Sequence, residues 1–107
     1  MTPSPHPEFK VDVSRAAVAQ WRNLVKRAQA IGAATEVRQA MREAIEALQT
    51  DPERFGDPLY RTKLSGGHVC RGIRAPLSVR FAILRNEKAV FVIAIQPVPA
   101  SALDQQE

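Results

Sequence analysis

The sequence has 107 residues, of which 45% are hydrophobic and 24% are charged, and its formal net charge is +4. These proportions are typical of one globular domain with one core, and they exclude a chain that is disordered throughout. No apolar run approaches the roughly 20 residues that span a bilayer, and the stretch MTPSPHPEF lacks the apolar centre of a signal peptide. The single cysteine, Cys70, excludes an internal disulfide and fits a reducing compartment. We therefore expect a cytoplasmic protein.

The excess positive charge lies in the second half of the chain. Residues 1–53 carry seven Lys or Arg and seven Asp or Glu, whereas residues 54–88 carry eight basic residues against two acidic ones. A basic surface of this kind attracts polyanions or acidic protein segments, and it is equally compatible with the solvated rim of a sheet.

The first half of the chain predicts a strand followed by two helices. Residues 1–8 form a proline-rich tail that we expect to be disordered. Apolar and polar residues alternate in FKVDVS, residues 9–14, which predicts a half-buried strand whose Ser14 caps the next helix. Residues 15–31 place Trp21 and other apolar residues on one helical face, and Gly32 ends this helix. Trp21 is expected to pack in the core or between the helices.

A second amphipathic helix is predicted to start near Thr35, because apolar residues then recur at helical spacing as far as Leu48. The short connection GAAT indicates that the two helices form an antiparallel hairpin. The stretch DPERFGDP, with two prolines and a glycine, is interpreted as the turn that ends the second helix.

The periodicity then changes to two, which predicts three strands: HVCRGIR, PLSVRFAILR and KAVFVIAIQ. The last strand has apolar residues on both faces, which indicates an interior strand covered on both sides. The sequence thus predicts an α+β domain over residues 9–98, with the order β-α-α-β-β-β and an antiparallel sheet of about four strands packed by the helical hairpin. Residues 99–107 are expected to form a second tail.

In this order and length, the chain resembles the RelE/ParE superfamily of bacterial toxins from toxin–antitoxin modules. The resemblance rests on FKVDVS, AQWRNL, AIEALQTDPERFGDPLYR and the hairpin LSVRFAILRNEKAVFVIAI, and it covers residues 9–98. It implies a toxin without metal or cofactor that binds a small acidic antitoxin. The cellular target implied by the resemblance is either the ribosome and its messenger RNA or DNA gyrase, and no membrane is involved.

In the ribosome-dependent members, cations on the open face of the sheet cut messenger RNA. On the direct alignment, their two lysine positions fall near Cys70 and Gly72, with Arg71 on the opposite face, and their early hairpin arginine falls on Ser78. The motif that follows their last strand becomes Gln96-Pro97-Val98. A shift of the alignment by one residue would return Arg71 to the set, and this alternative stays open.

The remaining polar residues give two sets of candidates. Arg71, Arg80 and His68 are weak candidates for catalysis, since RNA cleavage needs a proton acceptor and cations near the phosphate. The candidates for binding a partner or a nucleic acid are Arg61, Lys63, Arg71, Arg74 and Arg80. Each of these residues is also compatible with an ordinary solvated surface position, and Cys70 with a small buried hydrophobic residue.

Three functions from different classes are consistent with this sequence. The first is a toxin-like protein that acts by binding other proteins, as the resemblance to gyrase-targeting ParE members implies. The second is a ribosome-dependent endoribonuclease with a rearranged basic site, and the third is a non-toxic binding or scaffold descendant of the same fold.

Overall fold

The computed structural model describes residues 9–61 and 67–99. Apart from Pro99, the tails predicted at 1–8 and 99–107 therefore lie outside the described residues, as does Lys63. Among the helices of the described residues, none combines the length and the apolar character that crossing a membrane requires.

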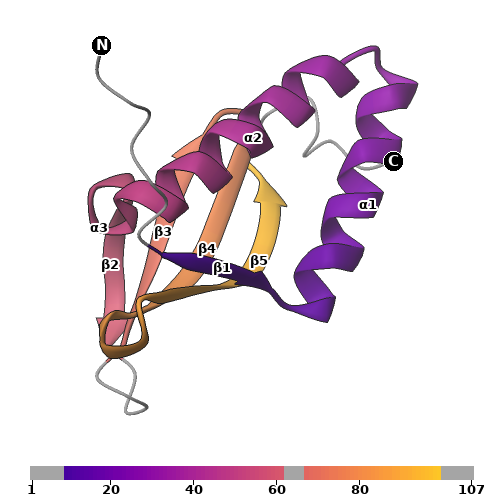
Figure 1. Cartoon of the computed structure of the whole chain (residues 1–107). Coiled ribbons are helices and arrows are strands. Elements are labelled where there is room, and N and C mark those ends of the chain that lie inside the picture. Colours follow the sequence, from indigo (N-terminus) through magenta and orange to yellow (C-terminus); the bar gives the residue numbers. More distant parts are fainter. Residues whose placement is uncertain (1–8, 62–66, 100–107) are drawn as a thin grey trace, which may run out of the picture.

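Five strands form one sheet in the order β1-β5-β4-β3-β2 (Figure 1). Neighbouring strands are antiparallel, except that β1 runs parallel to β5. The late hairpin β4–β5 therefore lies in the interior of the sheet, as its apolar sequence predicts. The strands are β1 (Lys10–Val13), β2 (Gly56–Arg61), β3 (His68–Arg74), β4 (Leu77–Leu84) and β5 (Ala89–Pro97).

The predicted helical hairpin is confirmed by α1 (Arg15–Ala30) and α2 (Ala34–Thr50), which lie on the same side of the sheet (Figure 1). Gly32 in the connection has a φ of 73°, a left-handed conformation that glycine adopts without strain and that helix ends commonly require. A 3₁₀ turn, η1 (Arg85–Glu87), joins β4 to β5.

The stretch DPERFGDP is more than the turn that its prolines indicate. Asp51 caps the short helix α3 (Pro52–Phe55) by accepting a hydrogen bond from the amide of Arg54. Strand β2 then follows at once and pairs with β3 at the edge of the sheet. Proline is tolerated in an edge strand because one side of the strand needs no ladder partner, which explains how Pro58 lies within β2.

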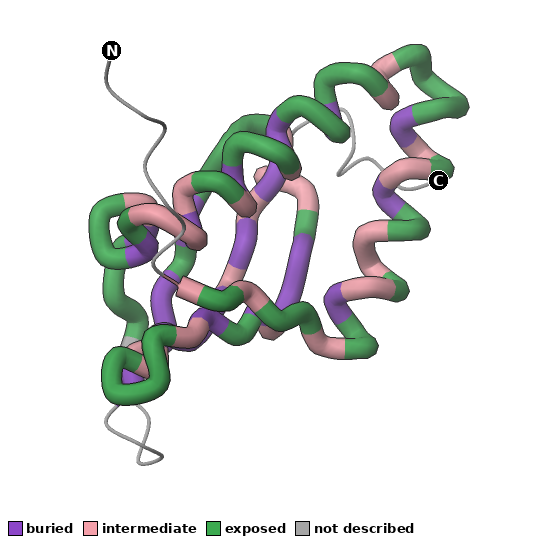
Figure 2. Tube along the Cα trace, in the orientation of Figure 1, coloured by how far each residue is buried: buried purple, intermediate pink, exposed green. Residues whose placement is uncertain are grey.

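The core lies between the helices and one face of the sheet, where the buried positions of α1, α2 and the inner strands meet (Figure 2). Its largest fully buried side chains include Phe81, Leu48, Leu77, Ile83 and Ile95. Trp21 is half-buried and packs against this cluster, as predicted. The prediction that β5 is covered on both sides is wrong, because the helices cover one face only and Phe91 on the other face remains 41% exposed.

The N-cap residue of α1 and one side chain within α1 bind the part of β5 that extends beyond β1. Strand β1 pairs with residues 89–92 only. The Ser14 hydroxyl accepts a hydrogen bond from the amide of Ala17, which caps α1, and donates one to the carbonyl of Ile93. Two residues further along β5, the amide of Ile95 donates to Oε1 of Gln20 at 2.8 Å. These bonds satisfy backbone groups that would otherwise lack a strand partner.

Two aromatic rings fill the space between α3 and the sheet. Phe55 stacks on the buried Phe81 with a centroid separation of 5.8 Å. The rings fit because Gly56 and Gly72 pair across β2 and β3 at this point, and neither has a side chain. A Cβ atom added to Gly72 would lie only 2.3 Å from the Phe55 ring.

Candidate functional site

The face of the sheet that the helices leave uncovered carries two of the candidate residues, Arg71 and Arg80. Alternation along each strand assigns side chains to this face, because those on the other face belong to the core. We define the open face by these residues: Lys10, Asp12, Asp57, Val69, Arg71, Ile73, Ser78, Arg80, Ala82, Phe91, Ala94 and Gln96.

Arg71 and Arg80 are direct neighbours on the open face, since they pair in the register of β3 and β4. Side chains at such paired positions lie close enough to interact, and like charges there destabilise the sheet. The Nε atom of Arg80 is moreover buried and has no hydrogen-bond partner among the residues that the structure describes. A carboxylate or a phosphate bound to the two guanidinium groups would relieve the repulsion.

Apolar side chains lie next to the arginine pair. Ile73 is 54% exposed and Phe91 is 41% exposed, although both belong to strands of the sheet. Asp57 pairs with Arg71 across β2 and β3, so its exposed carboxylate also belongs to the open face. Sequence reasoning did not single out these three residues, because the side to which each points depends on the register of the strands.

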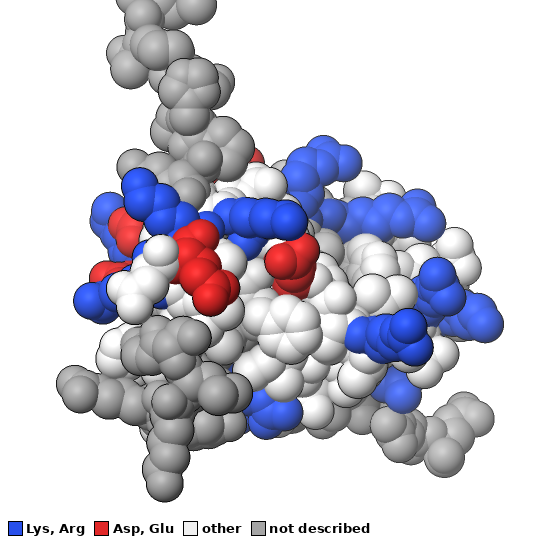
Figure 3. Space-filling model, turned by 60° about the horizontal axis from the view of Figure 1, so that its bottom comes forward, with Lys and Arg blue, Asp and Glu red and all other residues white. Residues whose placement is uncertain are grey.

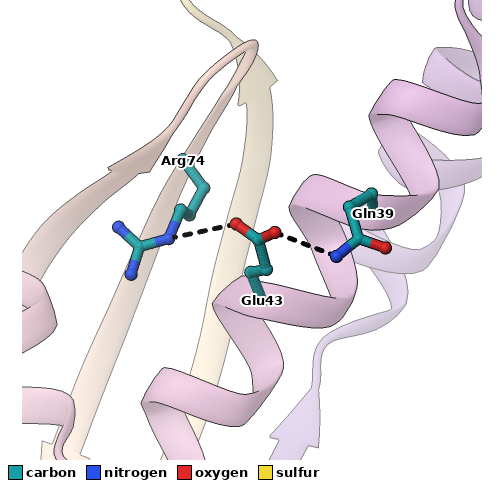
Figure 4. A network of polar contacts seen from close by, with 3 residues as sticks. All are labelled: Gln39, Glu43 and Arg74. Atoms are coloured by element: carbon teal, nitrogen blue, oxygen red, sulfur yellow. Dashed lines mark hydrogen bonds and ion pairs between the residues drawn. The ribbon is translucent and has the colours of Figure 1, made fainter.

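The structure separates two other candidates from this pair. The Arg74 side chain points to α2, where its Nε lies 3.6 Å from Oε1 of Glu43, and Glu43 also accepts a hydrogen bond from Gln39 at 2.9 Å (Figure 4). The Arg74 guanidinium also lies over the Phe55 ring at 5.3 Å. His68 faces a small cavity of about 170 Å³, which it lines with Cys70 and Glu53 on the helix side of the sheet.

Two candidates for partner or nucleic-acid binding remain, Arg61 and Lys63. Arg61 ends β2 and pairs in register with His68, and Lys63 lies outside the described residues. The structure therefore brings Arg71 and Arg80 together and leaves Arg74 and His68 apart from them.

The direct alignment with the RNA-cleaving motif assigns the wrong face to Arg71. Cys70 is buried and Gly72 packs against Phe55, so both face the helices, whereas Arg71 lies on the open face with Arg80. The alternative alignment, shifted by one residue, therefore agrees with the strand geometry. Ser78 does lie on the open face beside Ile73.

Cys70 is a buried thiol of the core, as predicted. Burial raises the pKa of the Cys70 thiol, and the carboxylates of Glu53 and Asp57 raise it further. A cysteine whose thiolate is disfavoured in this way is a poor nucleophile. Among the described residues, no group of three or more His, Cys, Asp or Glu side chains could hold a metal ion.

Comparison with solved structures identifies the fold. Neither a protein-family model nor a curated protein matches the sequence. The archaeal RelE–RelB complex from Pyrococcus horikoshii contains a chain with 16% identity and a TM-score of 0.65, and the alignment covers 88% of this chain and 99% of that one. The RelBE2 toxin–antitoxin complex of Mycobacterium tuberculosis gives 19% identity and a TM-score of 0.63, covering 84% and 98%.

A third likeness is to the chromosomal ParDE TA system of P. aeruginosa, with 16% identity, a TM-score of 0.55 and coverage of 85% and 97%. All three alignments span nearly the whole of the other chain. The chain therefore has the fold of the RelE and ParE toxins, and the architecture predicted from the resemblance is confirmed.

Proposed function

We propose that this protein is a toxin-like member of a toxin–antitoxin pair, and that it acts by binding proteins rather than by cutting messenger RNA. The observation that carries the proposal is the composition of the open face. Arg71 and Arg80 form a cationic pair there beside exposed apolar side chains, whereas His68 lies on the helix side of the sheet.

This composition suits a protein ligand better than RNA chemistry. Exposed Phe91 and Ile73 offer apolar surface, and the arginine pair offers charge-assisted hydrogen bonds to carboxylates. RNA cleavage needs a group that takes the proton from the 2′-hydroxyl. Among the described side chains of the open face, Asp12 and Asp57 are the carboxylates and there is no imidazole.

The partner we propose is a small acidic antitoxin-like protein. The RelE and RelBE2 chains with the same fold were solved in complexes with antitoxins, and a complementary charge would steer such a partner to this basic chain. For the cellular target, we propose a protein such as DNA gyrase. The described part of the open face has no imidazole, and this favours such a target over the ribosome.

One observation favours the alternative function. Two neighbouring guanidinium groups are suited to a phosphate, so Arg71 and Arg80 could hold the scissile group of messenger RNA, with a base supplied from elsewhere. In this alternative the protein is a ribosome-dependent endoribonuclease with a rearranged basic site.

Induced expression in a bacterial host distinguishes these functions. Arrested growth with intact messages and a DNA-damage response is the expected result. Cleaved messages with arrested translation would refute protein binding as the mode of action. Harmless expression of the folded protein would instead support a non-toxic binding or scaffold role.

A second experiment tests the open face. The product of the adjacent gene would be titrated into the protein by calorimetry, and Arg71→Glu/Arg80→Glu should weaken binding by about tenfold or more. The double variant Arg54→Glu/Lys88→Glu has the same change in net charge on exposed residues outside the open face, and it serves as the control. Equal losses in both variants would show a general charge effect and count against a site at the arginine pair.

A further inference from the structure

A cleft of about 430 Å³ lies between α1 and the end of β5. Gln20, Asn23 and Arg27 line it with polar groups from α1, and Leu24, Pro97 and Pro99 add apolar surface. None of the described residues that line this cleft is acidic. The cleft is therefore suited to a ligand that combines a negatively charged group with an apolar one.

The polar groups of the cleft are mainly hydrogen-bond donors. Oε1 of Gln20 accepts the amide proton of Ile95 at 2.8 Å, which leaves the Nε2 group of Gln20 as a donor. Arg27 is half-buried, and its guanidinium group carries donors and no acceptor. Hydrogen bonds from a guanidinium to a carboxylate are charge-assisted and stronger than those between neutral groups. A carboxylate is therefore a suitable ligand for this donor set.

The edge of β5 at the cleft offers little to an added strand. Ser14 binds the carbonyl of Ile93 and Gln20 binds the amide of Ile95, so side chains already occupy the positions that an incoming strand would use. Pro97, further along the same strand, has no amide proton to donate. A peptide in the cleft would therefore be held by its side chains rather than by a ladder of backbone hydrogen bonds.

The surroundings of the cleft favour a negatively charged segment that starts at Pro99. The amide of Val98 donates a hydrogen bond of 2.9 Å to the carbonyl of Pro76, which fixes the backbone just before Pro99 at the cleft. On the side of the molecule formed by α1, at the right of Figure 3, basic side chains gather without acidic ones. Arg22 and Lys26 of α1 are exposed outside the cleft, so they attract a negatively charged segment to this side without lining its binding site.

The residues that follow Pro99 carry the groups that the cleft would bind. Residues 100–107 read ASALDQQE and lie outside the described residues. This sequence contains the acidic residues Asp104 and Glu107, no basic residue, and Leu103 as its one large apolar residue. Asp104 is five residues beyond Pro99, which corresponds to at most about 17 Å of extended chain, so its carboxylate can reach a side chain of the same cleft.

We propose that the cleft between α1 and β5 binds residues 100–107 of the same chain. The Asp104 carboxylate then lies on the Arg27 guanidinium, and the Leu103 side chain packs on Pro97 at the apolar side of the cleft. Bound in this way, the segment ties the end of the sheet to the first helix. The inference does not depend on the proposed function, and the same segment of a second copy of the chain is the competing occupant.

Disulfide trapping in the whole chain tests this placement. Cys70 is the single cysteine, so Cys70→Ala gives a background without thiols. In that background, Asn23→Cys places a thiol in the cleft one helical turn before Arg27, and Gln105→Cys places another next to Asp104. The rate of disulfide formation in oxidised glutathione would be followed by non-reducing electrophoresis and mass spectrometry. We expect a disulfide within one molecule, because binding raises the effective concentration of the two thiols.

Charge changes locate the contact that holds the segment. Arg27→Glu should lower the rate of disulfide formation by about tenfold, since it removes the cation and repels Asp104. Adding Asp104→Arg to that variant should restore the rate to within about threefold, because the two charges are then exchanged. Lys26→Glu makes the same change in net charge on the neighbouring exposed residue, and it should keep the rate within about twofold, since exposed charges are screened by salt. Far-ultraviolet circular dichroism checks that each variant is folded.

Three results would overturn the inference. An unchanged rate in Arg27→Glu would show that the cleft does not hold the segment. Equal losses in Arg27→Glu and Lys26→Glu would show a general attraction to α1 instead of a contact in the cleft. Disulfides that join two molecules, at a rate that rises with protein concentration, would assign the segment to a second copy.

Discussion

Replacing Gly72 with alanine should destabilise the fold because of one close approach. The added Cβ would lie 2.3, 2.5 and 2.8 Å from three carbons of the Phe55 ring. Carbon atoms at van der Waals contact are about 3.5–4.0 Å apart, so the ring or the strand must move by about an ångström. Phe55 cannot withdraw freely, because it stacks on Phe81 and lies under the Arg74 guanidinium.

The magnitude is the difference between two effects. Inserting a carbon into a packed region costs about 1–3 kcal/mol, whereas removing a glycine from a strand gains about 0.5–1 kcal/mol in backbone entropy. The net loss in the free energy of unfolding should therefore be about 1–2 kcal/mol. For a domain of this size, that corresponds to a fall in Tm of roughly 4–15 °C.

Urea unfolding of a double-mutant cycle tests this reasoning. Phe55→Ala alone should cost about 2–3 kcal/mol, because a half-buried ring and its stacking partner are separated. With the ring gone, Gly72→Ala should become neutral or stabilise by about 0.5 kcal/mol, since only the entropy effect remains. Gly32→Ala is the control, because Gly32 has a positive φ but nothing within 4 Å of the place that a methyl group would take. It should therefore lose about 1 kcal/mol equally in both backgrounds. An unchanged effect of Gly72→Ala after Phe55→Ala would refute the clash.

Three further predictions concern single side chains. Ser14→Ala should lower the free energy of unfolding by about 1–2 kcal/mol in urea titrations, because the hydroxyl both caps α1 and binds β5; a loss below about 0.5 kcal/mol would contradict this double role. Arg80→Met should keep the packing of the aliphatic part of the side chain, remove the unpaired buried Nε and end the repulsion from Arg71. We therefore expect the free energy of unfolding to rise by about 0.5–1 kcal/mol, while the affinity for the partner falls. Lower stability of Arg80→Met would contradict the absence of an internal acceptor. In the folded protein, the pKa of the Cys70 thiol is raised above its ordinary value of 9.0. The stabilisation that comes from this shift is fully present below the pKa that the thiol has in the unfolded chain. It is lost as the pH rises through the pKa that the thiol has in the folded protein. Unfolding curves between about pH 8 and 10 should therefore show a steeper decline for the natural protein than for Cys70→Ala, and parallel declines would count against the shift.

The elements with strong periodicity could be predicted from the sequence. Both helices and the β4–β5 hairpin follow from apolar residues that recur every 3.6 or every two positions. Burial of these residues on one side determines whether a helix or a strand forms. Strand β2 could not be predicted in this way, because Gly56, Asp57 and Pro58 favour a turn. It forms because the neighbouring edge of β3 supplies hydrogen-bond partners, which a local pattern does not reveal.

The candidate site was predictable in composition but not in arrangement. Sequence reasoning chose Arg71, Arg74 and Arg80 as basic residues of the later strands, and the structure assigns the first and third to the open face. A shift of one residue exchanges the two faces of a strand, so the side to which Arg71 points depends on Gly72 fitting under Phe55. Similarly, apolar residues on both faces of β5 do not show whether a second layer exists to cover Phe91.

The parallel pairing of β1 with β5 has a consequence for synthesis of the chain. Lys10 pairs with Ala89, and the Ser14 hydroxyl reaches the carbonyl of Ile93, 79 residues away. On a ribosome, the first strand is thus made early and must wait for nearly the whole domain before its partner emerges. Until then the apolar sides of α1 and α2 have no sheet to cover them. A nascent chain of this protein would therefore expose the apolar surface of its helical hairpin to chaperones or to a binding partner that arrives early.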